Sequence, residues 1–241
     1  MFQQRIANIQ RHKKSTGPDG RKKKPNPEQE KLAMVYAAIE DVVRSRNGTE
    51  DATTATVSPT ECFAATMTAI EASDGQHLCE LFNLLSITLP AVKSSVMAAK
   101  WQVIAGVLFQ MTKVAAQVEL AEASAGRASS RLSKWLVACI SAFLKATTVR
   151  VPPRSINKQA LVRLHDLLLS STVDPRPKVR RTAQDGLIDI IETGQRGGRK
   201  SVRTFVCSEW VHACVCGLLS FLFAAVFTCF RDTFGGGTWC G

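Results

Sequence analysis

The sequence predicts an all-α protein in which antiparallel helix pairs stack into an α-solenoid. Apolar residues recur at helical spacing along residues 26–193, and this region shows no strand-like alternation. The apolar residues are mainly Ala, Leu, Val and Ile, with a single Tyr, which suits helices better than a β-sandwich. Short turns containing Pro, Gly or Asp separate the helices, so we expect successive helices to lie antiparallel.

Residues 1–25, before the helices, are predicted to form a flexible basic arm. Seven Lys or Arg fall within Arg11–Lys24, with Gly and Pro among them, and such a sequence cannot bury apolar surface. A solvated linker, a nuclear-targeting signal and an RNA contact all fit it. The whole chain has a formal net charge of +11, which favours an anionic partner such as nucleic acid or a lipid surface.

The first helix of the repeat region is expected to start at Asn26. This residue precedes Pro27 and stands three positions before Gln29, an arrangement that predicts an N-cap, a proline in the first turn and a capping-box partner. Asn47-Gly48 predicts where the helix stops. One face carries Leu32, Val35, Tyr36, Ile39, Val42 and Val43.

Three helix pairs are expected to follow. Ser58, Pro59 and Glu61 predict a capping box at the start of the first pair. The breaks between successive helices of these pairs are, in chain order, Asp74-Gly75, Pro90, Ser124–Gly126, Pro152-Pro153 and Asp174–Pro177. Helical periodicity does not reveal how pairs stack, so a closed helical bundle is the alternative to a solenoid.

The turn of the third pair supplies a more specific pattern. The segment Asp174–Ile191 resembles the turn and second helix of a HEAT repeat, in which an Asp precedes a Val-Arg pair, here Val179-Arg180. Ala183, Leu187 and Ile190 would then face the core. We expect Asp174 to cap the helix and Arg180 to reach the Asp of a neighbouring repeat, so that both belong to a structural ladder. The pattern favours a solenoid of the HEAT or armadillo type.

The order of features over residues 1–192 is similar to the N-terminal HEAT region of the ribosomal RNA-processing protein twelve family. The segments that carry the resemblance are Lys31–Asp41, Ser58–Met67, Leu84–Val92 and the string that begins at Asp174. The resemblance implies a long nuclear or nucleolar protein that acts in pre-ribosome maturation and export by binding, without catalysis. Two departures are that the family is several times longer and that nothing after Gly194 fits it.

We expect no catalytic, cofactor-binding or metal site. Gly194–Ser201 falls short of a phosphate-binding loop because Arg199 replaces the glycine before the lysine. Four Cys and His residues that could act as metal ligands lie in an apolar run, and their spacing differs from that of structural zinc sites. They are Cys207, His212, Cys214 and Cys216.

The composition changes abruptly near Gly194. Residues 194–210 are predicted to be a basic Gly-rich linker, residues 211–230 a hydrophobic segment without a charged side chain, and residues 231–241 a tail. The hydrophobic segment is long enough to span a bilayer with the solenoid in the cytoplasm, and a membrane-tethered adaptor is therefore the alternative function. Translated non-coding sequence and a buried helix of a continuing solenoid are the other interpretations.

The functional prediction is a non-enzymatic scaffold for ribosome assembly, located in the nucleus and nucleolus. Its expected partners are pre-ribosomal RNA, ribosome assembly proteins or both. The cations expected to contact phosphate lie in loops or at the exposed start of a helix. They are Lys13, Lys14, Arg21, Lys22, Lys23 and Lys24 in the arm, and Arg176, Lys178 and Arg181 near the third pair.

Overall fold

The computed structural model describes residues 2–12, 26–48, 57–73, 75, 77–124 and 130–196. These residues form eight α-helices and two short 3-10 helices, and no strand occurs among them. The elements are α1 (Phe2–His12), α2 (Pro27–Arg46), α3 (Pro59–Ala72), α4 (Leu78–Thr88), η1 (Leu89–Ala91), α5 (Ser94–Ser124), α6 (Arg131–Arg150), η2 (Pro153–Ser155), α7 (Lys158–Ser171) and α8 (Pro177–Arg196). The predicted all-α fold class is confirmed. The chain divides into two compact units between Thr193 and Gly194, and nearly all described residues belong to the first.

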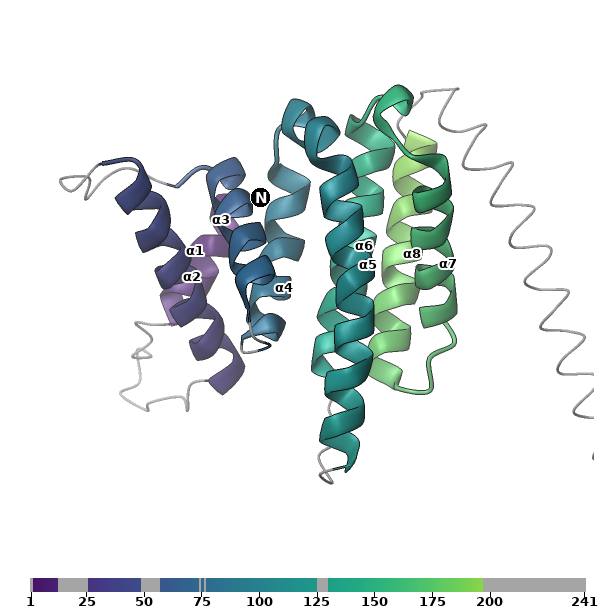
Figure 1. Cartoon of the computed structure of the whole chain (residues 1–241), viewed down its shortest axis with the longest axis horizontal. Coiled ribbons are helices and arrows are strands. Elements are labelled where there is room, and N and C mark those ends of the chain that lie inside the picture. The colour runs from purple at the N-terminus through teal and green to yellow at the C-terminus, as the bar shows by residue number, and fades with distance from the viewer. Residues whose placement is uncertain are drawn as a thin grey trace, which may run out of the picture. The chain divides into compact units, whose positions relative to one another are not determined.

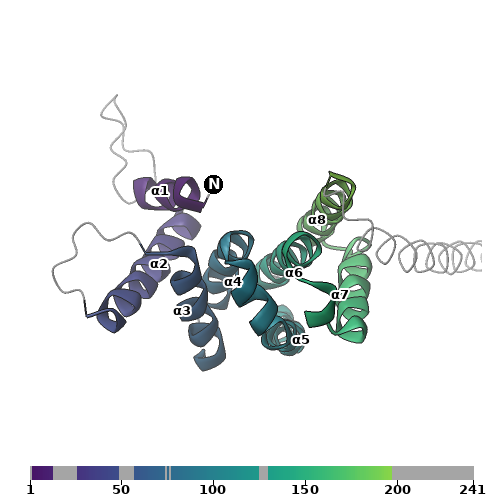
Figure 2. The same ribbon diagram turned by 90° about the horizontal axis from the view of Figure 1, so that it is seen from above.

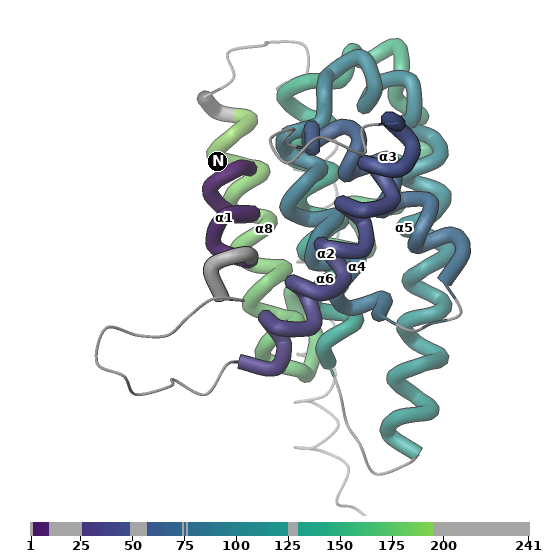
Figure 3. The backbone as a smooth tube through the Cα atoms, turned by 90° about the vertical axis from the view of Figure 1, so that its left-hand side faces the viewer, coloured from purple at the N-terminus to yellow at the C-terminus, as the bar shows by residue number. Residues whose placement is uncertain are grey.

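Helices α3 to α8 form three successive pairs in an open row (Figure 1). Seen from above, α3, α5 and α7 make one layer, and α2, α4, α6 and α8 make the other (Figure 2). Figure 3 shows α3 and α5 beside α2, α4 and α6, with α5 projecting beyond its neighbours. Because the pairs follow one another without closing on themselves, the arrangement is a solenoid and not a closed bundle.

Local sequence signals set the starts of α2 and α3. Ser58 Oγ accepts the amide of Glu61 at 3.2 Å, and the Glu61 carboxylate accepts the amide of Ser58 at 3.0 Å, so the predicted capping box is confirmed. Asn26 also caps its helix, but its side chain accepts the amide of Glu28 at 3.1 Å. The bond therefore goes to the second residue of α2, and the capping box expected with Gln29 does not form.

Helix α1 was not expected from the sequence. It lies within the predicted flexible arm, yet it packs on α2 and α4. Its side chains Phe2, Ile6 and Ile9 are buried, and their spacing places them on one helical face. The flexible-arm prediction is wrong for residues 2–12. Three apolar residues among polar ones are enough to hold a helix in place when α2 and α4 provide a surface for them to pack on. Residues 13–25 of the predicted arm lie outside the described part of the chain.

The core lies between the two layers. Trp101, Phe82 and Phe143 are its largest fully buried side chains. Trp101 Nε1 donates to Thr147 Oγ1 at 3.1 Å, and its ring lies 5.6 Å from that of Phe143, which joins α5 to α6. Not every residue predicted to be apolar core is buried: Val42 is 46% exposed at the surface of α2.

Helix α8 approaches α6 more closely than a side chain would allow. A Cβ placed on Gly186 would lie 2.1 Å from Ser141 Oγ and 2.6 Å from Ser141 Cβ. Such separations are too short for atoms that are not bonded, so this junction between the second and third pairs requires glycine. Val179, Ala183 and Ile190 of α8 are buried nearby on the same side of the helix.

Candidate functional site

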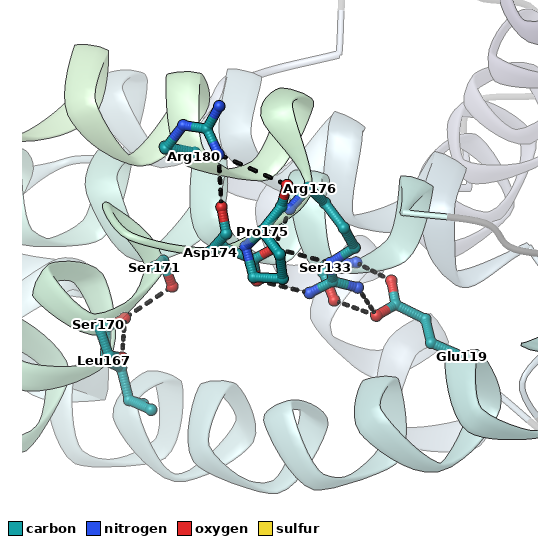
Figure 4. A network of polar contacts seen from close by, with 9 residues as sticks. All are labelled: Glu119, Ser133, Leu167, Ser170, Ser171, Asp174, Pro175, Arg176 and Arg180. Atoms are coloured by element: carbon teal, nitrogen blue, oxygen red, sulfur yellow. Dashed lines mark hydrogen bonds and ion pairs between the residues drawn. The ribbon is translucent and has the colours of Figure 1, made fainter. Parts of the chain in front are cut away.

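Arg176, the residue that precedes α8, joins the third helix pair to the second (Figure 4). Its guanidinium donates to both carboxylate oxygens of Asp174, with distances of 2.7 Å from Nη2 and 2.8 Å from Nε. Its Nη1 forms an ion pair with Glu119 of α5. Glu119 in turn accepts hydrogen bonds from the amide and hydroxyl of Ser133 in α6, at 3.0 and 2.6 Å. We call this network the Arg176 clamp.

Two carboxylates offset the positive charge of Arg176 within the clamp. The hydrogen bond from Arg176 holds the pKa of Asp174 below its ordinary value, and the bonds to Asp174 and Glu119 raise the pKa of Arg176. The side chains of Glu119 and Asp174 are 11% and 17% exposed. Arg176 was predicted to contact phosphate, but it is engaged by two carboxylates. The other predicted cations of this region, Lys178 and Arg181, are exposed on α8.

Asp174 and Arg180, the expected ladder residues, meet within one turn (Figure 4). Asp174 Oδ1 accepts the amide of Arg176 at 2.9 Å, and Arg180 Nη1 donates to the backbone carbonyl of Asp174 at 2.9 Å. The contact from this turn to the neighbouring pair is made by Arg176, which sequence reasoning had assigned to RNA. A bond between Arg180 and the Asp of a neighbouring repeat stays a prediction.

A second arginine holds two carboxylates at the same end of the helix pairs. Arg131, the first residue of α6, pairs through Nε with Glu28 at 3.1 Å and through Nη2 with Glu80 at 3.3 Å. Glu28 and Glu80 lie in the first turns of α2 and α4. This Arg131 clamp therefore joins the amino-terminal ends of three helices in one layer. Sequence analysis missed it because the three residues are far apart in the chain, and an acid in a first turn signals only a favourable helix dipole.

Burial shifts the pKa values of the described cysteines and of His165. Burial raises the pKa of the Cys62 and Cys79 thiols to about 11, so both stay protonated near neutral pH. Burial also lowers the pKa of His165, whose Nδ1 lies 2.9 Å from the carbonyl of Leu161 in its own helix. Within the described ranges, no group of three or more His, Cys, Asp or Glu side chains could hold a metal ion. The possible ligands at 207–216 lie outside those ranges.

Two described helices, α5 and α6, are long and apolar enough to cross a membrane. This finding rests on length and composition alone, and the core helix of a soluble protein passes the same test. In this structure α5 and α6 pack on each other, and α6 also packs on α4. The finding therefore assigns no membrane role to either helix. The predicted span at 211–230 lies outside the described residues.

Comparison with known proteins agrees with this architecture. Residues 21–222 match the family described as RRP12-like, N-terminal HEAT repeats. The chain belongs to this family. Proteins called RRP12-like protein from Homo sapiens and Gallus gallus are 29% and 28% identical to it over 162 and 161 residues. These alignments cover 67% and 66% of this chain but 11% of each relative, so the chain spans a small fraction of their length.

The family match confirms the predicted resemblance and corrects its extent. We expected nothing after Gly194 to fit the RRP12-like family, but the match continues to residue 222. The expectation rested on the sudden change to an uncharged, apolar composition. Composition is a poor boundary signal there, because a helix buried on all sides has the same apolar character as a separate segment.

Proposed function

We propose that this RRP12-like chain is a non-enzymatic HEAT-repeat scaffold for ribosome biogenesis, acting in the nucleus and nucleolus. Its partners would be pre-ribosomal RNA, ribosome assembly proteins or both. The observation that carries the proposal is the family match over residues 21–222, which include the whole repeat region, together with a net charge of +11. A solenoid supports such a role because its stacked pairs present extended surfaces to a partner.

In this proposal, RNA is held through its phosphate backbone by exposed cations. Lys178 and Arg181, at the exposed start of α8, are two of them. The others are the predicted cations of the arm, Lys13, Lys14, Arg21, Lys22, Lys23 and Lys24. Arg176 is removed from the set because the Arg176 clamp uses its charge. Backbone contacts of this kind give affinity with little sequence preference and a strong dependence on salt.

A salt titration tests the proposal. Binding of a fluorescent single-stranded RNA is measured by anisotropy, and log affinity should fall with log salt at a slope of about −0.7 per phosphate contact. The variant with Gln at Arg21, Lys22, Lys23 and Lys24 should have a slope flatter by up to about 3. The matched control has Gln at four exposed cations outside the set, Arg5, Lys31, Arg46 and Lys113, and should retain the slope.

The outcomes separate RNA from protein partners. If the arm variant keeps the full slope, the arm does not bind the backbone. If the unaltered chain fails to bind RNA at low salt, the scaffold acts through proteins alone, and capture of ribosome assembly proteins becomes the remaining test.

The alternative is a membrane-tethered helical-repeat adaptor anchored by residues 211–230, which the uncharged apolar run supports. The family match overlaps the first half of this run, and we therefore favour the scaffold. Co-flotation of the full chain with lipid vesicles that resists high salt would support the anchor instead.

A further inference from the structure

The middle of the chain contains few acidic residues. From Leu81 to His165 the sequence has eleven Lys or Arg but two carboxylates, Glu119 and Glu122. Both acids lie in the last turns of α5, at the end of the helix pairs that carries the clamps. The opposite end, shown at the top of Figure 1, therefore receives cations from this stretch and no acids.

Two successive turns bring four of these cations to the opposite end. Arg150, the last residue of α6, donates from Nη1 to the carbonyl of Val92 at 3.1 Å, which places the end of α6 against the turn that precedes α5. Lys93 follows in that turn and is exposed. Arg154 lies in η2, which also packs on α5, and Lys158 begins α7; both side chains are exposed. We call Lys93, Arg150, Arg154 and Lys158 the basic edge.

Three cations of the basic edge, Lys93, Arg150 and Arg154, differ from the clamp arginines. Among the described residues, no carboxylate lies within ion-pair distance of Lys93, Arg150 or Arg154. Glu61 is close enough for Lys93 to help lower its pKa, but the larger causes are its hydrogen bonds with Ser58 and Asn47. The first turns of α5 and α7, which follow these turns, contain no acidic residue.

We propose that the basic edge is a binding surface for the phosphodiester backbone of single-stranded RNA. The inference rests on the proposed RNA-binding function and assigns it to residues outside the arm and α8. The Lys and Arg side chains of two adjacent turns can contact successive phosphates, with each Lys as a point charge and each Arg as a planar set of donors. The turns Leu89–Ser94 and Val151–Lys158 contain no aromatic residue, whereas protein interfaces and base-stacking surfaces are enriched in them. We therefore expect backbone contacts with little preference among bases.

The experiment uses the full chain and a fluorescent single-stranded RNA. The edge variant is Lys93→Gln/Arg154→Gln/Lys158→Gln; Arg150 is kept because it bonds the Val92 carbonyl. The control variant Arg5→Gln/Lys31→Gln/Lys113→Gln removes the same charge from exposed positions elsewhere. We expect the edge variant to bind about tenfold more weakly or worse at low salt, with a salt slope flatter by about 2, and the control to match the unaltered chain. Thermal unfolding checks that both variants fold.

The possible results separate the basic edge from the proposed function. Normal binding by a folded edge variant, together with weak binding by the arm variant, would overturn the basic edge and leave RNA binding intact. No RNA binding by the unaltered chain would overturn both. Competition with polyglutamate, which stands in for an acidic protein, completes the test. If RNA displaces polyglutamate that is bound to the chain, the result supports the basic edge. A chain that binds polyglutamate through the edge but ignores RNA would assign the surface to an acidic protein.

Discussion

The two ends of the helix pairs use positive charge in opposite ways. At the end where α2, α4, α6 and α8 begin, Arg131 and Arg176 each hold two carboxylates and join separate helices. At the other end, Lys93, Arg150 and Arg154 have no carboxylate within ion-pair distance among the described residues. Arginines of similar appearance in the sequence therefore serve stability at one end and remain available to a partner at the other.

This difference explains why exposure alone does not identify binding residues. Arg176 is 37% exposed and stands in a basic turn, as a phosphate-binding residue would. Its contacts show that two carboxylates already pair with its charge. If phosphate displaced Glu119 or Asp174, that poorly exposed carboxylate would lose its partner. The availability of a cation depends on the acids that face it, and these come from other helices.

Gly186 of α8 packs against Ser141 of α6. Replacing Gly186 tests whether this packing stabilises the chain independently of charge. In Gly186→Ala the new methyl group would overlap Ser141, so we expect a loss of roughly 2 to 3 kcal/mol in the free energy of unfolding. Urea denaturation followed by circular dichroism measures it, and the loss should not change with salt. Gly106→Ala is the control, because an added Cβ there meets nothing within 4 Å. It should stabilise α5 by about 0.5 to 1 kcal/mol.

The double variant Ser141→Gly/Gly186→Ala removes the side chain that the methyl group would strike. It should recover part of the loss, and the two changes should couple favourably in a double-mutant cycle. A Gly186→Ala chain as stable as the unaltered protein would show that α8 does not sit this close to α6.

The Arg176 clamp should contribute the next largest effect. Arg176→Ala leaves Glu119 and Asp174 without their shared cation, and we expect a loss of roughly 2 kcal/mol, between the values for exposed and buried pairs. Arg154→Ala, from the basic edge, is the matched control and should change stability by less than about 0.5 kcal/mol. Equal losses in the two variants, measured by urea denaturation, would remove the distinction between the two ends.

Acid titration should show the smallest effect. Because the pKa of Asp174 is lower in the folded chain than in the unfolded chain, its contribution is present above about pH 4 and is lost as the pH falls through the folded value. We expect Asp174→Asn to reduce stability on the order of 1 kcal/mol at neutral pH, and the difference from the unaltered chain to vanish in acid. A difference that stays constant down to about pH 2 would mean that the charge of Asp174 is not what stabilises the turn.

Much of the solenoid could be predicted because its signals are local. Ser58 and Glu61 form their capping box within one turn, and the helical stripes reflect which face each helix must bury. The missed helix α1 had a weaker signal: Phe2, Ile6 and Ile9 make a short stripe that is stable only against α2 and α4. The two clamps could not be predicted, since each joins residues from several helices and depends on how the pairs stack.

The sequence by itself determined the helices from α2 to α8, their order in pairs, the excess of positive charge and the resemblance to RRP12-like HEAT repeats. These follow from periodicity, caps and composition, which act over a few residues or over the whole chain. Only the tertiary structure decided which cations are neutralised and which are free to meet a partner. The physical reason is that ion pairing acts over a few ångströms in space. Stacking brings Glu119 to Arg176 and Glu80 to Arg131, while among the described residues no carboxylate comes within ion-pair distance of Lys93, Arg150 or Arg154.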